Sequence, residues 1–139
     1  MKIVKRKANL IPYRIVNNQF EFYLSLRSKT AKQYPNCWSF WGGGIEDDEK
    51  PEESMIREIK EELDWTPATY EFLGVYYDSM PNEKSIYFTR VEEDFEKLIN
   101  IRESQGGRFF TKDEIENENK IISQDKKPLF DLSDRLTSS

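Results

Sequence analysis

The sequence predicts a single strand-rich domain of the α/β or α+β class with one central amphipathic helix. Its 139 residues fit one domain, and its 37% hydrophobic and 14% aromatic residues suffice for a core. Alternating apolar residues mark several short segments, whereas helical spacing is clearest over residues 51–64. No internal repeat, low-complexity tract or linker divides the chain, so we assign residues 1–139 to one domain.

The composition excludes several classes of function. The net charge of −5 argues against a broad nucleic-acid-binding surface. There is no histidine, and Cys37 is the only cysteine, so histidine-based triads, intrachain disulfides and cysteine-rich zinc sites are excluded. No apolar run reaches the roughly 18–20 residues of a membrane span, and the N-terminus lacks the apolar region of a signal peptide. We therefore expect a cytoplasmic protein without a membrane segment.

The N-terminal segment predicts a β-hairpin. Residues 2–16 read as one strand, or as two strands broken at Pro12. Asn17 and Asn18 suit a tight turn because Asn tolerates left-handed backbone conformations. Apolar residues then alternate through 19–27, which predicts a half-buried strand paired with its predecessor. The alternating residues are Phe20, Phe22, Leu24 and Leu26.

A loop and a short aromatic strand lead to a run of glycines. Residues 28–36 form a polar, basic loop, in which Lys29 and Lys32 either contact a phosphate or are simply solvated. Residues 37–41 (CWSFW) predict a short strand, and 42–44 (GGG) a turn.

The central helix is expected from Pro51 to about Asp64. Proline at the first helical position loses no hydrogen bond, and Pro67 lies beyond the predicted end. Its apolar stripe comprises Met55, Ile56, Ile59 and Leu63.

Two further strands, at 68–79 and 84–93, are predicted around a turn at 80–84. Residues 94–103 are ambiguous between a helical turn and a loop.

Near the C-terminus we expect a short strand at 107–110 and a brief helix at Thr111. Glu114 lies three residues after Thr111, as in a capping box. Residues 129–136 predict a terminal helix.

The central helix carries three glutamates on one face. Glu58, Glu61 and Glu62 fall within an arc of roughly 100°. Their repulsion destabilises a bare helix, and a hard divalent cation such as Mg²⁺ or Mn²⁺ would compensate for it. The alternative is a solvated acidic face with an Arg57–Glu61 ion pair. Likewise, the glycines either let backbone groups approach a ligand or form a flexible loop.

The spacing of these residues resembles the Nudix box. Gly43 is followed by five residues, Glu49, seven residues, Arg57-Glu58, an aliphatic residue, any residue, and Glu61-Glu62. Every charged position of that pattern is filled. The departures are Asp64 and Trp65, where the family has Gly and an aliphatic residue, and Trp41, where many members have Pro.

This resemblance implies a fold, an activity and a cofactor. The fold is an α/β/α sandwich on a mixed sheet, with the box as a loop–helix–loop. The activity is hydrolysis of a nucleoside diphosphate linked to another moiety, with Mg²⁺ or Mn²⁺ and an activated water. By resemblance, the metal ligands are the carboxylates of Glu58, Glu61 and Glu62 and the Gly43 carbonyl.

The resemblance also assigns supporting residues. Arg57 and Glu49 would pair to orient the loop against the helix. The general base would be Glu58 or a carboxylate from a distant loop, for which Glu103 is the first candidate. Glu103 is otherwise an ordinary exposed loop residue, and Glu92, Glu93 and Asp94 are the further alternatives.

Substrate selection lies outside the box. Trp41 and Lys29 are candidate substrate-binding residues; aromatic residues such as Tyr13, Phe22 and Tyr87 either stack a base or belong to the core. The compact length favours a nucleoside triphosphate or modified nucleotide, whereas Pro81, sixteen residues beyond the box, has the spacing of ADP-ribose pyrophosphatases. The expected partner is a small nucleotide rather than an extended nucleic acid, bound by a monomer or homodimer. A catalytically silent nucleotide-binding Nudix domain is the remaining alternative.

Overall fold

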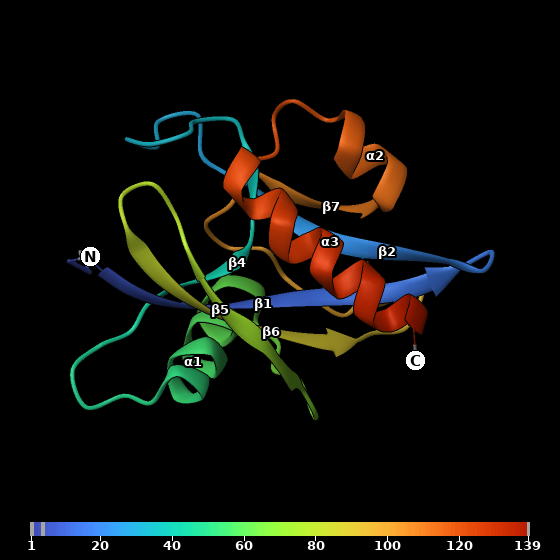
Figure 1. The fold of residues 1–139 in the computed structure, drawn as a ribbon. Helices are drawn as coiled ribbons and strands as arrows, with labels where there is room; N and C mark the ends of the chain where they lie inside the picture. Colours follow the sequence, from blue (N-terminus) through green and yellow to red (C-terminus); the bar gives the residue numbers. More distant parts are fainter. Residues whose placement is uncertain (1, 4, 139) are drawn as a thin grey trace.

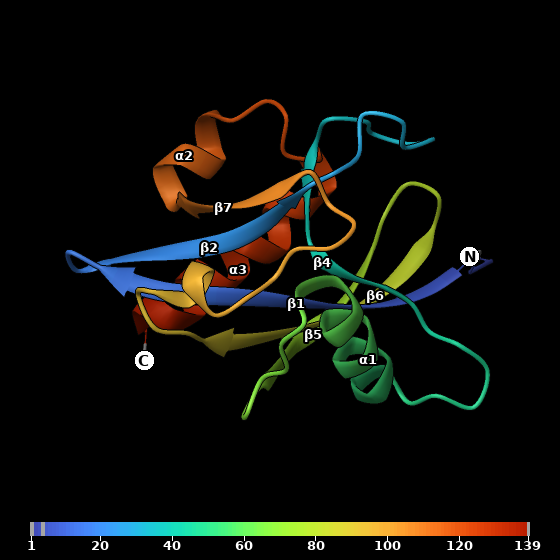
Figure 2. The ribbon, with the colours of Figure 1, turned by 180° about the vertical axis from the view of Figure 1, so that it is seen from behind.

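The structure is a computed structural model that describes residues 2, 3 and 5–138. Within these residues a seven-stranded mixed sheet carries helices on both faces (Figures 1 and 2). The strands are β1 (Lys5–Val16), β2 (Gln19–Leu26), β3 (Trp38–Ser39), β4 (Trp41–Gly44), β5 (Glu71–Tyr77), β6 (Asn82–Arg90) and β7 (Gly106–Thr111). The helices are α1 (Pro51–Leu63), α2 (Lys112–Asn117) and α3 (Ser123–Ser138), with a 3₁₀ turn, η1, at Phe95–Lys97.

Strand β1 organises the sheet because it pairs with three other strands. The strand order is β3-β2-β1-β6-β5, with β4 also paired to β1 and β7 to β2. The β1–β6 pair is parallel, and all other strand pairs of the described residues are antiparallel. The mixed sheet expected from the family resemblance is therefore confirmed.

The predicted hairpin is confirmed, with differences in both strands. Asn17 and Asn18 have φ of 52° and 64°, the left-handed conformation that a tight hairpin turn requires. Strand β1 begins at Lys5 rather than at residue 2 (residue 4 lies outside the described residues), and it runs unbroken through Pro12. Of the two alternatives, the single strand is confirmed and the break at Pro12 is excluded.

Strand β2 is buried on both faces instead of one. Phe22 and Leu24 pack on the α3 side, while Tyr23 packs on the α1 side. The three side chains are at most 1% exposed. Apolar alternation predicted a half-buried strand, and this was wrong because helices cover both faces of the sheet.

Each face of the sheet has its own apolar core, which makes the domain an α/β/α sandwich. The α1-side core joins the sheet to Met55, Ile59 and Leu63 of α1. The α3-side core joins it to Ile115 of α2 and to Leu129 and Leu132 of α3.

The triple glycine forms a strand, not the predicted turn. Gly42, Gly43 and Gly44 pair with residues 7–9 of β1 as part of β4. Gly42 has φ of +133°, and a Cβ there would collide with the Ala8 carbonyl oxygen. The glycines therefore permit close approach of two strands, and the chain turns only afterwards, at residues 45–50.

Helix α1 begins and ends where the sequence predicted. Pro51 is its first residue, and Glu53 accepts a hydrogen bond from the backbone N–H of Lys50 (2.8 Å). Asp64 ends the helix in the left-handed conformation, with φ of 51° and ψ of 42°. This is the conformation for which the family uses glycine.

The C-terminal half follows the prediction with one extension. Strands β5 and β6 pair antiparallel, and residues 94–103 resolve into η1 followed by a loop. The capping box at Thr111 is confirmed by reciprocal hydrogen bonds with Glu114 of 2.9 and 3.2 Å. Helix α3 is longer than the predicted 129–136, because it continues through Pro128 back to Ser123.

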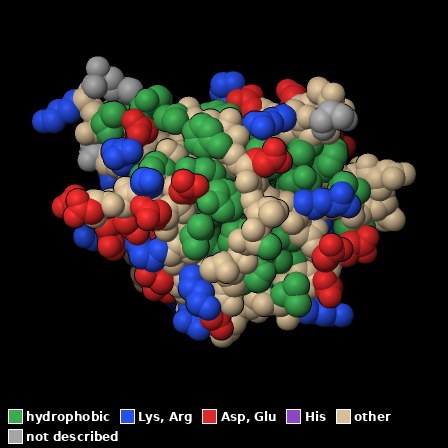
Figure 3. Space-filling view, turned by 90° about the horizontal axis from the view of Figure 1, so that it is seen from below, with side chains coloured by type: hydrophobic (Ala, Val, Ile, Leu, Met, Phe, Trp, Pro, Cys, Tyr) green, Lys and Arg blue, Asp and Glu red, His purple; other side chains and the backbone are tan. Residues whose placement is uncertain are grey.

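The surface is mixed, with apolar side chains reaching solvent between acidic and basic ones (Figure 3). Phe72, Val75 and Tyr77 of β5 are each nearly half exposed. Among the described residues, no helix has the length and apolarity to span a membrane.

Candidate active site

Helix α1 is fixed against β4 by polar contacts. The backbone N–H of Gly42 donates to both carboxylate oxygens of Glu62 (3.2 and 3.3 Å), and the Ser54 hydroxyl donates to the Gly44 carbonyl (3.2 Å). The absent side chain of Gly43 makes room for Glu58, since a Cβ on Gly43 would lie 2.6 Å from the Glu58 carboxyl carbon. Two glutamates of α1 therefore lie directly against the glycine strand.

Arg57 joins the loop to the helix, as the sequence predicted. Its guanidinium donates to both oxygens of Glu49 (2.8 and 3.0 Å) and to the Gly44 carbonyl (3.2 Å). It also donates to Glu58 (3.1 Å) and, at longer range, to Glu61 (3.4 Å). The hydrogen bond from Arg57 and that from the Glu46 backbone lower the pKa of Glu49, so this carboxylate stays ionised as a structural partner.

Glu103 reaches the same site from a distant loop. The last turn of a helix has carbonyls without intrahelical partners, and here the backbone N–H groups of Asn100 and Arg102 donate to Leu63 and Glu62 (2.9 and 3.0 Å). This attachment places Glu103 beside Glu62, and both line one cavity. The structure therefore brings Glu103, a candidate general base, to the same cavity as Glu62.

Burial and the charges of neighbouring glutamates raise the pKa of Glu58 and of Glu62. Burial, together with the charges of Glu58, Glu103 and Glu61, raises the pKa of Glu62 to about 8 against the hydrogen bond from Gly42. Burial likewise raises the pKa of Glu58, although Arg57 opposes this shift. The crowding of negative charge is the electrostatic signature of a site that a cation would stabilise.

The residues present fit a hard divalent cation in chemistry and in space. The donors are carboxylate oxygens and one backbone carbonyl, which Mg²⁺ and Mn²⁺ prefer, and Gly43 leaves a cradle that a Cβ would fill. Among the described residues, however, no three carboxylates already form a complete metal site. The side chain of Glu61 is free to change its orientation and complete such a site, because it is 55% exposed and its contact with Arg57 is long (3.4 Å).

The two predicted substrate-binding residues do not line the site with their side chains. Trp41 is fully buried and stacks on Tyr23 at a centroid distance of 5.5 Å. Its ring belongs to the core, so the prediction that it binds substrate is wrong. Lys29 is exposed and lines neither of the two cavities at this end of the sheet, whereas Arg27, two residues earlier, lines both.

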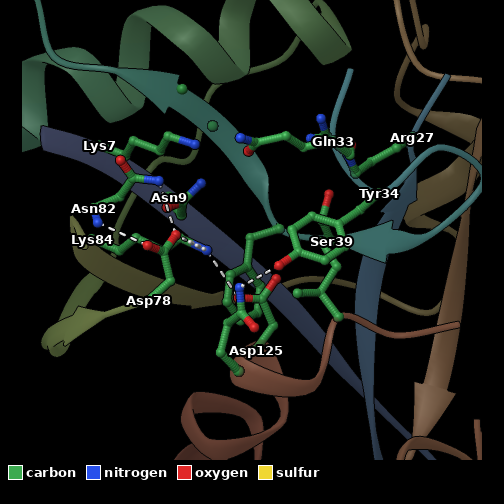
Figure 4. A pocket seen from close by; sticks show the side chains of 15 residues that line it. Lys7, Asn9, Arg27, Gln33, Tyr34, Ser39, Asp78, Asn82, Lys84 and Asp125 are labelled. Atoms are coloured by element: carbon green, nitrogen blue, oxygen red, sulfur yellow. Dashed lines mark hydrogen bonds and ion pairs between the residues drawn. The ribbon is translucent and has the colours of Figure 1, made fainter. Parts of the chain in front are cut away.

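A second, polar cavity adjoins the first across the segment from Ser39 to Gly42 (Figure 4). Its charged and amide side chains include Lys7, Asn9, Asp78, Lys84 and Asp125. Sequence reasoning missed all five, because they come from β1, the β5–β6 connection, β6 and α3, and no local spacing relates them.

Comparison with known proteins agrees with this geometry. A family model described as NUDIX domain matches residues 11–132. An RNA pyrophosphohydrolase of Marinomonas sp. is 49% identical over 39 residues, which cover 28% of this chain and 24% of the relative. A human diphosphoinositol polyphosphate phosphohydrolase is 29% identical over 77 residues, covering 52% and 42%. The chain thus spans less than half the length of these relatives.

Solved structures share the whole fold. A mutT/nudix family protein from Listeria innocua has a TM-score of 0.78 at 16% identity, covering 99% of this chain and 97% of that one. An Ap4A hydrolase of C. elegans has a TM-score of 0.74 at 21% identity, covering 96% and 99%. Because the family model matches residues 11–132, which are most of the chain, the protein belongs to the NUDIX family.

Proposed function

We propose that the protein is a cytoplasmic, divalent-metal-dependent pyrophosphohydrolase that acts on a nucleoside triphosphate or modified nucleotide. The observation that carries this proposal is the arrangement of three glutamates at the glycine strand: Glu58 lies against Gly43, Glu62 accepts from the Gly42 N–H, and Glu103 lines one cavity with Glu62. The similar proteins named above, a pyrophosphohydrolase and a phosphohydrolase, support the same reaction class.

Glu58, Glu61 and Glu62, with the Gly43 carbonyl, would hold Mg²⁺ or Mn²⁺. When bound, such an ion neutralises phosphate charge and acidifies a coordinated water. Arg57 and Glu49 contribute by holding residues 45–50 against α1, which fixes the backbone beside the carboxylates.

Glu103 is the general base that we favour. Glu58 lies under Gly43 and accepts a hydrogen bond from Arg57 (3.1 Å), so one of its oxygens is already engaged. The side chain of Glu103 is exposed, lines the cavity with Glu62, and has no hydrogen-bond partner among the described residues. It is therefore placed to accept a proton from a water at the phosphate.

Hydrolysis of a nucleotide panel with Mg²⁺ or Mn²⁺ tests the proposal. The panel should contain nucleoside triphosphates, oxidised nucleotides, ADP-ribose and nucleotide sugars, with released phosphate and pyrophosphate measured. Glu62→Gln is expected to reduce kcat/KM by about 10²-fold or more, because it removes a charged ligand oxygen. Glu116→Gln, an exposed position on α2, is the matched control and should leave the rate unchanged.

A silent binding domain gives a different result. It would show nucleotide-induced thermal stabilisation without turnover of any compound, and that outcome would exclude the proposed reaction.

A further inference from the structure

The cavity beside the acidic site is lined mainly by polar and charged side chains. Its lining includes Asn9 of β1, Lys84 of β6, Asp125 near the start of α3, and Tyr34 of the loop between β2 and β3 (Figure 4). Arg27 and Gly42 line both cavities. The two cavities therefore adjoin, and a substrate with its phosphates at Glu62 has the second cavity within reach.

Most polar atoms in this cavity already have partners. Asp78 accepts from the backbone N–H groups of Met80 and Asn82 (2.9 and 2.8 Å) and from the Asn82 amide (3.0 Å). Lys84 donates to Oδ1 of Asp125 (3.0 Å).

Two acceptor atoms have none. Oδ2 of Asp125 and Oδ1 of Asn9 take part in no hydrogen bond with the described residues, although Asp125 is 2% exposed and Asn9 6%. The other atoms of both side chains are engaged, since the Asn9 amide N–H donates to the Trp41 carbonyl (3.2 Å). Unpaired buried acceptors are unfavourable, and a ligand with two hydrogen-bond donors would satisfy them.

We infer that Asn9 and Asp125 read the base of the nucleotide substrate by accepting two neighbouring N–H donors. This inference rests on the proposed function. Guanine presents such an edge, with its ring N–H beside an amino group, whereas adenine presents one amino group beside an acceptor nitrogen. Lys7 lines the same cavity as a donor suited to the carbonyl oxygen of guanine.

Tyr34 supplies an aromatic surface for the planar ring. It lines the cavity, is 40% exposed, and has φ of +52°, which is unusual for a bulky residue. Residues held in such conformations are concentrated at ligand sites.

The loop carrying Gln33 and Tyr34 lines the same cavity as the two acceptors. Both oxygens are shielded from solvent in this conformation, and Gln33 and Tyr34 contact Met80 and Gln124 across the cavity. These contacts are long (3.7 and 3.3 Å) and exposed, so their separation costs little. In the proposed complex this loop moves aside and a base contacts Asn9 and Asp125.

Calorimetric titration of the wild-type protein with GMP, IMP and AMP, without divalent metal, tests the inference directly. IMP lacks only the amino group of guanine, and AMP places an acceptor where guanine has its ring N–H. GMP is expected to bind about 10-fold or more tightly than either, because each alternative leaves an acceptor unpaired. Equal affinities, or equal binding of ribose 5-phosphate, would overturn the inference.

Asp125→Asn provides a sharper second test. The amide oxygen should stay toward the Lys84 ammonium, so the NH₂ group replaces Oδ2 and turns an acceptor into a donor. The preference for GMP over AMP should disappear or reverse. Asp134→Asn makes the same change at an exposed position of α3 and should leave the preference intact. Identical selectivity in the two variants contradicts the assignment.

Turnover assays separate this inference from the proposed function. Hydrolysis of GTP, ATP, CTP and UTP with equal kcat/KM would support the function and overturn the inference. Selective GMP binding without hydrolysis of any nucleotide would support the inference and overturn the function.

Discussion

Gly43 and Glu58 illustrate how one missing side chain permits the site. The Glu58 carboxylate occupies the space that a Cβ at Gly43 would need, with all three carboxylate atoms within 2.8 Å of that position. Because the obstructed group is the end of a flexible side chain, a larger residue would displace the carboxylate without breaking the strand pair.

Gly43→Ala should therefore reduce activity more than stability. We expect kcat/KM to fall by about 10- to 100-fold, because a displacement of about 1 Å in a catalytic group has this effect. The melting temperature should change little. Gly106→Ala is the matched control, since nothing lies within 4 Å of a Cβ there. A variant that melts much earlier, or that retains full activity, would contradict this account.

The contacts of a single side chain were predicted correctly from the sequence where its partner lies close to it along the chain. Glu49 and Arg57 pair as expected because Glu49 lies in the short loop that leads directly into the helix carrying Arg57. Trp41 was wrongly assigned because its burial depends on Tyr23, a residue of another strand. Asn9 and Asp125 gave no signal, because they meet only after β1 and α3 have packed on either side of the cavity.

At the level of elements, the end of α1 departs from the family pattern without losing its geometry. Asp64 adopts the left-handed conformation and forms ion pairs with Lys60 (3.6 Å) and Arg102 (3.2 Å). Exposed pairs of this kind contribute about 0–1 kcal/mol, so the backbone conformation dominates the stability of this cap.

The stability of variants at position 64 should depend on how easily the new residue adopts the left-handed backbone conformation. The free energy of unfolding of the Asp64→Gly variant should be about 1 kcal/mol higher than that of Asp64→Ala. Both substitutions remove the ion pairs, but only glycine adopts φ of 51° without strain. Urea denaturation measures this difference. If alanine proved as stable as glycine, the left-handed cap would have no energetic role.

Arg57 holds the loop to α1 through geometry that lysine lacks. Arg57→Lys loses the paired hydrogen bonds to Glu49 and the contact with the Gly44 carbonyl. We expect about a 10-fold lower kcat with KM nearly unchanged, measured in steady-state kinetics. Arg102→Lys, which alters a single exposed ion pair, should have no effect on kcat.

Elements governed by local signals were predicted well, whereas β4 was not. The first hairpin, α1 and the capping box at Thr111 each follow from turn residues, proline placement or helical spacing. The glycines of β4 have low strand propensity, and their pairing with residues 7–9 of β1 involves a partner more than 30 positions away.

Considered as a whole, the molecule concentrates unfavourable charge at one cavity, which links stability to pH. The pKa of Glu62 is raised to about 8 from an ordinary value of 4.5, mainly by burial. In the metal-free protein, the native state therefore binds more protons than the unfolded state between these values. The stability that Glu62 contributes is complete below pH 4.5 and is lost as the pH rises through about 8.

Thermal unfolding in EDTA should show this dependence. The melting temperature is expected to fall between about pH 5 and about pH 8, and Mg²⁺ at the upper pH should restore it by compensating the carboxylates. Glu62→Gln should flatten the profile over the same range. A wild-type melting temperature that rises steadily across this range in EDTA would contradict the raised pKa of Glu62.

The pairing of β1 with β6 has a consequence for how the protein is made. Their first paired residues, Lys5 and Asn82, are 77 positions apart (82 − 5), and contacts this distant in sequence slow folding. The ribosome will have synthesised all of α1 before β6 exists, and the polar cavity also needs Asp125. A nascent chain should thus carry its acidic helix before it can discriminate a base, and nucleotide selectivity should be the last property to appear during synthesis.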